Sequence, residues 1–396
     1  MIRKPVLERI YQGAHIQRWN DHIRPKGFTE LDKQSQKMII AYILGSYEEQ
    51  DKNISIDWRK LIEGGIFEYL HRIILTDIKP PVYHKLMNER GKEINKWVYG
   101  LLGDDLQSIK GDFFQKFKEY FDNPSYAVLE KKVLKASHYL STNWEFKIIY
   151  PMNSVIYGIE ETKKAIENEL EEHYDLAGVQ KIKLGNKTSD LIDLIGQLRF
   201  QQRWAQSPRV PETSVMGHML IVAIMSYLCS LEIEACNQRL CNNYFTALFH
   251  DIPEVLTRDI ISPVKRSVDG LDDIIKDIEK KQMDEKFFPL LPESWHEKMR
   301  FYIEDEFAGK IVEDGKIKNV TSDEINDKYN FDKYNPVDGQ IIKGCDHLAA
   351  LIEARISISH GITSVHLDKG SETIALDYKN KNIAGIDFGQ LFDYFK

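Results

Sequence analysis

Four side chains in the second half of the chain are of the types that hold a divalent metal ion. His218, the adjacent pair His250-Asp251 and Asp346 each lie in or next to an apolar stretch. Neutral imidazole and ionised carboxylate are compact ligands that leave coordination positions for water and phosphate oxygens. Adjacent residues on a helix point about 100° apart, so this pair can share an ion only if other helices supply further ligands. The sequence therefore predicts a hydrolytic metal site assembled from several helices.

Further polar residues stand at informative distances from these four. Glu254 follows His250 by four residues, which predicts a shared helical face, and Asp259 falls where that helix would end. The pair Arg203-Trp204 ends fourteen residues before the first candidate ligand. Each of these could instead be structural, as a solvated carboxylate, a turn residue or a packing tryptophan. It is their combination that indicates a functional site.

Helices must carry these residues, because apolar residues recur at three- and four-residue spacing through much of the chain. The strongest helical segments are Val6–Trp19, Ser35–Leu44, Ser189–Trp204, His218–Leu231 and Gly339–Glu353. Two short runs, Lys147–Tyr150 and Ser364–Leu367, are candidates for strands, and neither is flanked by a convincing hairpin turn. The predicted class is all-α, in the form of a helical bundle.

The two halves of the chain resemble each other, which indicates a duplicated domain. Three blocks align: Gln12–Trp19 with Gln197–Trp204, Gly64–Arg72 with His250–Arg258, and Val133–His138 with Ile341–Asp346. In this alignment Gly64 and Gly65 stand opposite His250-Asp251, His138 stands opposite Asp346, and Lys37 falls near the position of His218. Each candidate metal ligand of the second half is therefore substituted in the first half. We therefore predict a degenerate copy over 1–180 and an intact copy over 188–396, with chance similarity as the alternative. A charged segment near 313–335 lengthens only the second copy and is expected to form a surface loop.

Size and charge narrow the class of protein. The chain has 396 residues, 42% of them hydrophobic, which is enough for two domains with a substantial core. A net charge of -8 disfavours nucleic acid or an anionic membrane as the main partner. Four scattered cysteines predict reduced thiols, and the N-terminus lacks the apolar run of a secretion signal. Met219–Leu231 is too short to span a membrane and is expected to be a buried core helix, so the predicted location is the cytoplasm.

The second half resembles the bacterial 5′-deoxynucleotidase branch of the HD-domain superfamily. The resemblance rests on the string His250–Asp259, the pair Arg203-Trp204, the run Ser262–Lys265 and the late Asp346. It covers about 190–358 directly and reaches 1–180 only through the internal repeat. The fold that it implies is the HD-domain helical bundle, here duplicated.

The resemblance implies one divalent metal ion and a deoxynucleoside 5′-monophosphate as substrate. The implied ligands are His218, His250, Asp251 and Asp346, and Mn, Co, Mg, Ni and Zn are not distinguished. The implied role of Arg203 is to position the substrate, and that of Trp204 is to crowd the sugar 2′ position. Among the remaining residues, Glu254 would manage a proton, Asp259 would orient a water or a sugar hydroxyl, and Lys265 would add positive charge near the phosphate.

Three functions stay open at this point. The first is release of phosphate from deoxynucleoside 5′-monophosphates. The second is a deoxynucleoside triphosphohydrolase, including one that depletes nucleotides during phage infection, because Arg258 stands where the family usually has a small residue. The third is a non-catalytic nucleotide-sensing protein. No phosphate-binding GxxxxGK[ST] loop, GxGxxG fingerprint, HExxH motif or GxSxG elbow occurs in the sequence.

The resemblance also implies a role for the first half. Small deoxynucleotidases of this type work as homodimers, so a fused pair predicts an intramolecular pseudo-dimer, with further self-association left open. The degenerate copy is either a packing partner only or, through Arg18 and Trp19, a pocket for a regulatory nucleotide.

Overall fold

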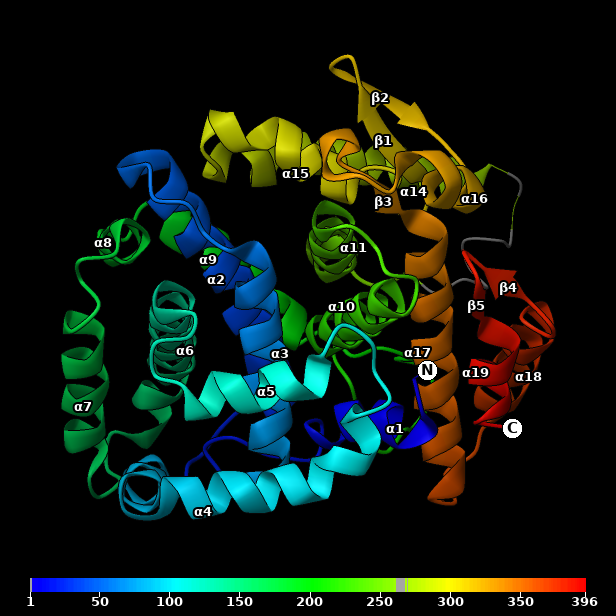
Figure 1. Ribbon diagram of the computed structural model, residues 1–396. Coiled ribbons are helices and arrows are strands. Elements are labelled where there is room, and N and C mark those ends of the chain that lie inside the picture. The colour runs from blue at the N-terminus through cyan, green and yellow to red at the C-terminus, as the bar shows by residue number, and fades with distance from the viewer. Residues whose placement is uncertain (1, 261–267, 269) are drawn as a thin grey trace.

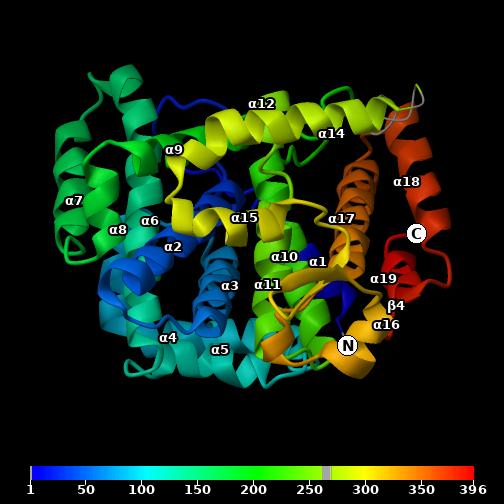
Figure 2. The ribbon, with the colours of Figure 1, turned by 90° about the horizontal axis from the view of Figure 1, so that it is seen from above.

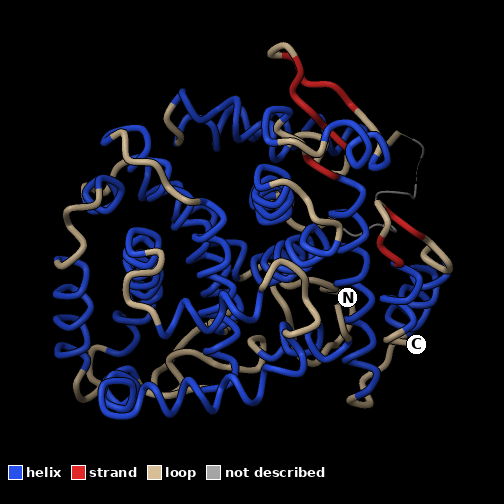
Figure 3. The backbone as a smooth tube through the Cα atoms, viewed as in Figure 1, coloured by secondary structure: helices blue, strands red, loops and turns tan. Residues whose placement is uncertain are grey.

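Helices form nearly the whole protein, which confirms the predicted all-α class (Figure 1, Figure 3). The computed structural model describes residues 2–260, 268 and 270–396, so Lys265 and its neighbours in the run Ser262–Lys265 lie outside the described residues. The helices of the first half are α1 (Lys4–Gln12), α2 (Glu30–Lys52), α3 (Trp58–Leu75), α4 (Pro80–Leu106), α5 (Phe113–Asp122), α6 (Val128–Ile149), α7 (Ile159–Glu171) and α8 (Ala177–Lys183). Those of the second half are α9 (Lys187–Gly196), α10 (Val215–Glu232), α11 (Asn237–Phe249), α12 (Glu254–Thr257), α14 (Leu271–Gln282), α15 (His296–Ile303), α16 (Ser322–Glu324), α17 (Gly339–Ser359), α18 (Val365–Asp377) and α19 (Phe388–Asp393).

Two helices, α2 and α10, pack against each other at the centre of the molecule. Helix α6 packs on α2 in the first half, and α17 packs on α10 in the second, while α3 and α11 contact each other. Viewed from above, α14 runs along one edge of the protein and α4 and α5 along the opposite edge (Figure 2). The central position explains why α2 and α10 are buried on all sides, since a helix enclosed by its neighbours has no solvent face.

Helix α10 is the one helix in the described part of the chain that is long and apolar enough to cross a membrane. Its 18-residue window is 94% buried inside the protein. Packing against α2, α11 and α17 accounts for its apolar composition. This confirms the prediction of a buried core helix around Met219–Leu231.

Both predicted strands are wrong. Lys147–Tyr150 belongs to the end of α6 and the 3-10 turn after it, and Ser364 caps the start of α18 by accepting a hydrogen bond from the Leu367 amide. The described strands lie elsewhere: β1 (Gly309–Glu313), β2 (Lys316–Asn319), β3 (Val337–Asp338), β4 (Asn382–Ile383) and β5 (Ile386–Asp387). Strand β1 pairs antiparallel with both β2 and β3, and β4 pairs with β5. The segment 313–335, expected to be a surface loop, instead holds a hairpin strand and short helical turns.

The two tryptophans singled out by the sequence lie beyond the ends of the helices that precede them in the structure. Helix α1 ends at Gln12 and α9 at Gly196, so the expected segments Val6–Trp19 and Ser189–Trp204 are too long. Trp19 and Trp204 have φ angles of 56° and 57°, in the left-handed region that terminates a right-handed helix. Such a conformation costs a bulky residue about 1–3 kcal/mol, so other contacts must hold both side chains in place.

The halves repeat the same local structure around these tryptophans. An isolated antiparallel bridge joins Gln17 to Thr29 in the first half and Gln202 to Ser214 in the second, at the constant offset of 185 residues. Thr29 caps α2 and Ser214 caps α10, each by accepting a hydrogen bond from an amide three residues on. This correspondence supports the predicted repeat, whose boundaries at 1–180 and 188–396 stay a prediction.

The four cysteines are free thiols, as the sequence predicted. Cys229 and Cys345 lie on α10 and α17 with their sulfur atoms 3.8 Å apart. The neighbouring thiol of Cys345 and then burial raise the pKa of Cys229, which keeps it protonated.

Candidate metal centre

Three of the predicted metal ligands meet at one point although they come from different parts of the second half. His218 lies in the first turn of α10, His250 directly follows α11, and Asp346 lies in α17. One ligand atom from each lies within 4.8 Å of those of the other two. The packing of α11 and α17 on α10 therefore builds the cluster, as the prediction of a site shared by several helices required.

Asp251, the fourth predicted ligand, borders the same point. Its Oδ2 lies 3.2 Å from His250 Nε2 and 3.9 Å from His218 Nε2. Residues 251–253 form a turn between α11 and the short α12, so the His-Asp pair does not lie on a continuous helix. Both side chains nevertheless reach the cluster, since His250 Nε2 and Asp251 Oδ2 lie close to each other and to His218.

The charges in the cluster favour a cation. His218 Nε2 lies 2.9 Å from Asp346 Oδ1, which makes a close imidazole–carboxylate contact. Burial opposes the ionised forms, but the two histidines hold the pKa of Asp346 below its usual range. Burial likewise disfavours the charged form of His250, yet Asp251 and then Asp346 outweigh it and raise its pKa to about 9. A divalent ion could replace that proton.

Two buried atoms in the cluster also fit a metal. His250 Nε2 and Asp251 Oδ2 are both enclosed; they lie 3.2 Å from each other, and within the described part of the protein neither makes a well-oriented hydrogen bond. The other ring nitrogen of His250 lies 2.7 Å from the Ala247 carbonyl oxygen, to which it can donate, and this leaves Nε2 as the atom that faces the cluster. Buried polar atoms without hydrogen bonds are costly, and coordination would satisfy both. The donor set of imidazole and carboxylate suits several first-row ions and Mg²⁺ without selecting one.

A buried carboxylate that the sequence reasoning missed organises the cluster from behind. Glu353 lies on α17, two helical turns after Asp346, and is inaccessible to solvent. Its Oε1 accepts a hydrogen bond from Thr213 and lies 3.6 Å from His218 Nδ1. Glu353 can therefore orient the His218 ring so that Nε2 faces the other ligands.

The same carboxylate holds both residues predicted to contact the substrate. Glu353 Oε2 accepts hydrogen bonds from Arg203 Nε at 3.3 Å and from Trp204 Nε1 at 3.0 Å. Arg203 Nη1 lies 3.7 Å from Asp251 Oδ2, so the guanidinium borders the metal cluster. This anchoring explains how Trp204 keeps its left-handed backbone, and it places one cation and one indole beside the candidate ligands.

The remaining predicted residues differ in what the structure says of them. Glu254 is buried in α12, but the turn at 251–253 means that it does not share a helical face with His250, contrary to the expectation. Asp259 follows the end of α12, as expected. Burial opposes the charge of Arg203, but Glu353 and, more weakly, Asp346, Asp251 and Asp259 raise the pKa of that arginine. Lys265 falls in the part of the chain that is not described.

A second acidic group near the cluster went unnoticed in the sequence. Glu306 lies in the turn between α15 and β1, and its carboxyl interacts electrostatically with both His250 and Asp251. Burial raises the pKa of Glu306. No sequence motif indicates Glu306, because its carboxyl comes near His250 and Asp251 only through the tertiary structure of the second half.

The corresponding positions of the first half hold no matching ligand set, because glycines replace the His-Asp pair and only His138 is of a type that binds metal ions. A Cβ atom on Gly65 would lie 2.2 Å from Met38 Sδ, and one on Gly64 would lie 2.8 Å from Leu134 Cδ1. The counterpart of His218 at the constant offset is Lys33 rather than the predicted Lys37, and Lys33 Nζ lies 2.8 Å from His138 Nδ1. Lys37 instead points to Glu68, 2.5 Å away.

Comparisons with known proteins agree with this geometry. Residues 195–375 match the family described as HD domain. This part of the chain belongs to the HD-domain family. The matched range contains all four predicted ligands together with Arg203, Trp204 and Glu353.

Two curated relatives match parts of the chain. The chain is 37% identical over 83 residues to a 4'-phosphooxetanocin A phosphatase of Priestia megaterium, which is 20% of this chain and 42% of the relative. It is 37% identical over 106 residues to a dATP triphosphohydrolase of Acinetobacter phage SH-Ab 15497, which is 23% of this chain and 52% of the relative. The chain thus spans about half the length of the curated relatives it matches.

Proposed function

We propose that this protein is a metal-dependent phosphohydrolase that releases phosphate from deoxynucleoside 5′-monophosphates. The observation that carries the proposal is the His218–His250–Asp346 cluster with a buried arginine at its edge. A metal site alone would suit many reactions. A cation placed beside it adds a group that binds phosphate oxygens, which points to phosphoryl transfer.

The residues around the cluster can divide the chemistry among themselves. A bound divalent ion would polarise a phosphoryl oxygen and lower the pKa of a water. Arg203, fixed on one side by Glu353, would bind and orient the phosphate. Glu254 would take up or release a proton, and Asp259, beyond the end of α12, would orient the water or a sugar hydroxyl.

Trp204 supports a preference for deoxyribose. Its indole is fixed by the hydrogen bond to Glu353, and its ring is close enough to α18 that a Cβ on Gly370 would lie 3.1 Å from it. An indole held on two sides cannot move aside for a ribose 2′-hydroxyl. Steric conflict and an unsatisfied hydroxyl together cost about 1–3 kcal/mol, or about ten- to a hundredfold in rate.

A second candidate is hydrolysis of a deoxynucleoside triphosphate to the nucleoside and triphosphate. The relative that is a dATP triphosphohydrolase favours it, since it matches the chain over the longer stretch. Arg258 adds to this, because its exposed side chain follows α12 and could reach further phosphates. The relative that is a phosphatase favours the monophosphate.

We further propose that the two halves form an intramolecular pseudo-dimer with one hydrolytic site. The repeated bridges and helix caps support it, as does the packing of α2 on α10. In each half the first helix also reaches the central helix of the other, since α1 contacts α10 and α9 contacts α2. Further association of whole chains is not required for the site.

One experiment separates the candidate functions. Ribo- and deoxynucleoside mono-, di- and triphosphates would be incubated with the full chain and Mn²⁺, Co²⁺, Mg²⁺, Ni²⁺ or Zn²⁺, with Asp251→Ala as the blank. The proposal expects inorganic phosphate from deoxynucleoside monophosphates. Inorganic triphosphate as product would establish the second candidate instead. Nucleotide binding without any product, in every metal, would contradict both and leave a nucleotide-sensing protein.

A further inference from the structure

The first half of the molecule holds a buried cluster of cations at the place where the second half has its metal cluster. Arg18, Lys33 and Arg72, here called the N-terminal cation cluster, come from the loop after α1, from α2 and from α3. Arg18 corresponds to Arg203 and Lys33 to His218 at the offset of 185 residues. The Lys33–His138 contact of 2.8 Å takes the place of the His218–Asp346 contact of 2.9 Å.

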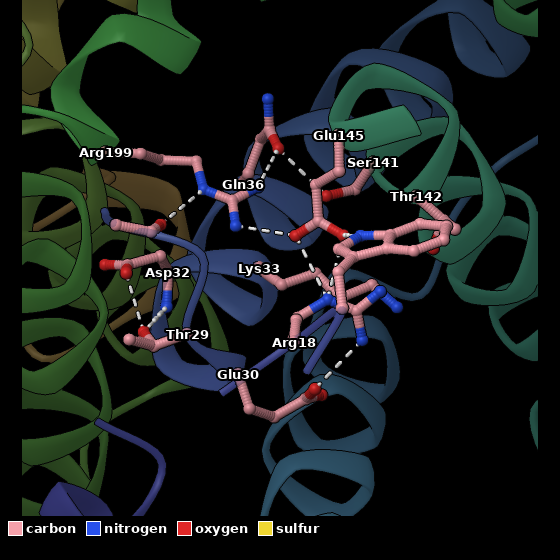
Figure 4. A network of polar contacts seen from close by, with 12 residues as sticks. Arg18, Thr29, Glu30, Asp32, Lys33, Gln36, Ser141, Thr142, Glu145 and Arg199 are labelled. Atoms are coloured by element: carbon pink, nitrogen blue, oxygen red, sulfur yellow. Dashed lines mark hydrogen bonds and ion pairs between the residues drawn. The ribbon is translucent and has the colours of Figure 1, made fainter. Parts of the chain in front are cut away.

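The carboxylates near this cluster are already shared among several donors (Figure 4). Glu145 accepts hydrogen bonds from Arg18 at 2.9 Å, from Arg199 at 2.6 Å and from the Trp19 indole at 2.8 Å. Glu30 accepts from Arg18 at 3.1 Å and from Gln34 at 2.7 Å, and it lies 3.9 Å from Arg72. Among the described residues, Glu145 and Glu30 therefore pair with the guanidinium groups of Arg18, Arg72 and Arg199, and neither forms an ion pair with Lys33.

Lys33 is the cation that lacks a counter-ion. Its side chain is fully buried, and no carboxylate of the described residues lies within 4 Å of its Nζ; the atoms in contact are the ring nitrogens of His138. Burial and then Arg18 lower the pKa of Lys33. Asp32 lies on the same helix but bonds to the hydroxyls of Thr29 and Ser214 instead. Glu30 and Glu145 act on Lys33 only from beyond ion-pair distance and do not offset this shift, so a phosphate that reached Lys33 would supply the counter-ion that stabilises its ammonium form.

The arginines of the two sites are exposed to solvent to the same degree. The Arg18 and Arg203 side chains are each 13% exposed, and His138 and Trp19 are partly exposed. Trp19 keeps the left-handed backbone and the indole-to-glutamate bond of Trp204. The same strained backbone and the same indole-to-glutamate bond therefore stand beside both clusters.

We propose that the N-terminal cation cluster binds the phosphate group of a deoxynucleoside phosphate without a metal ion, with the ammonium of Lys33 in the place of the metal. The choice of a deoxynucleoside phosphate rests on the proposed function. Arg18 and Trp19 correspond to Arg203 and Trp204, which are proposed to bind the substrate in the second half. The bound nucleotide is not hydrolysed, since Gly64 and Gly65 replace the His-Asp pair and supply no side-chain ligand atoms.

The test uses the full chain with His250→Ala and Asp251→Ala, which disables the metal cluster, in buffer containing EDTA. Calorimetry with each of the four deoxynucleoside monophosphates should show one binding event per chain. At least one nucleotide should bind about tenfold more tightly than inorganic phosphate, because stacking and sugar contacts add to the phosphate contacts. No binding of any nucleotide, or equal affinity for inorganic phosphate, would overturn the proposal.

Adding Lys33→Met should weaken that binding by about tenfold or more, the effect of removing a buried charge-assisted contact. Lys37→Met is the matched control, because Lys37 is an equally buried lysine one turn along α2 that is already paired with Glu68. Its affinity should stay within about twofold of the parent. Equal weakening by both variants would contradict the role of Lys33.

If Lys33→Met does not fold, hydrogen exchange on the parent double variant gives an independent answer. Nucleotide should protect amides in 17–33 and 138–145, and protection confined to 203–218 would overturn the proposal. Phosphate release by the wild-type chain with Mn²⁺ is measured separately. Failure of that activity would contradict the proposed function, whereas absent EDTA-resistant binding would contradict only this inference.

Discussion

The two halves of this protein place opposite charges at equivalent positions of a similar frame. In the second half, Asp251 and Asp346 face two histidines and favour a cation. In the first half, Lys33 and His138 occupy the corresponding places, and the surrounding arginines favour an anion. The outer frame is kept, since a buried glutamate on the last long helix holds an arginine and a tryptophan in both. Under the proposed duplication, the residues proposed to bind the substrate are kept in the half where other residues replace the candidate metal ligands.

Among single substitutions, replacing a candidate metal ligand should cause the largest loss of hydrolysis. Asp346→Asn removes a charge that His218 and His250 face, and hydrolysis should fall by about a thousandfold or more. Phosphate release with Mn²⁺ measures the loss, and calorimetry with Mn²⁺ should show weaker binding. Wild-type activity in the folded variant would mean that the cluster is not the hydrolytic centre.

Removing the shared glutamate of the first half should mainly affect stability. Glu145→Gln leaves Arg18 and Arg199 buried without a full counter-charge, which should lower the free energy of unfolding by about 3–5 kcal/mol. Urea denaturation followed by circular dichroism provides the value. The matched change Glu353→Gln should in addition reduce hydrolysis, because it loosens Arg203 and His218. A stability loss below about 1 kcal/mol for Glu145→Gln would show that this network is not a main support of the fold.

Trp204→Ala should reduce the preference for deoxyribose by about ten- to a hundredfold, since the indole that excludes the 2′-hydroxyl is gone. The ratio of kcat/KM for deoxy- and ribonucleoside monophosphates measures it. The matched Trp19→Ala variant should keep the wild-type ratio, because that indole lies in the other half. If both variants or neither changed the ratio, sugar selection would not reside in Trp204.

The pKa of about 9 for His250 predicts a dependence of metal affinity on pH. A metal ion binds the neutral imidazole, so protons compete with it at every pH below that value. Affinity for Mn²⁺ should rise by up to about tenfold per pH unit from about pH 7 to 9 and then level off. Calorimetry in buffers of different ionisation enthalpy should detect proton release at about pH 7. Affinity that falls or stays constant over this range would contradict the raised pKa.

The candidate metal ligands could be predicted from their residue types, whereas the residues that hold them in place were harder to find. Histidine and aspartate at apolar positions already indicate chemistry. Glu353 looked like an ordinary helix residue, although Glu145 stands at the same seven-residue distance after His138 and could have marked both. Strict use of the 185-residue offset would likewise have selected Lys33 over Lys37.

Other features depend on tertiary structure and leave little trace in the sequence. The left-handed backbone at Trp19 and Trp204 is rare for a bulky residue, so helical periodicity extended both helices too far. The break after His250 has the same origin, because the turn at 251–253 follows from packing around the cluster. Arg199 reaches Glu145 across the contact between the halves, and no local pattern foretells such a contact.

The central claim is that one half of the chain hydrolyses phosphate esters through a metal ion and the other half has no metal site. The most direct test is a titration of the metal-free protein with Mn²⁺ while phosphate release is followed. The protein concentration is kept well above the dissociation constant for Mn²⁺, so that each added ion binds. Activity should rise linearly and reach its plateau at one ion per chain. A plateau at two ions, or an ion bound without phosphate release from any deoxynucleotide, would contradict it.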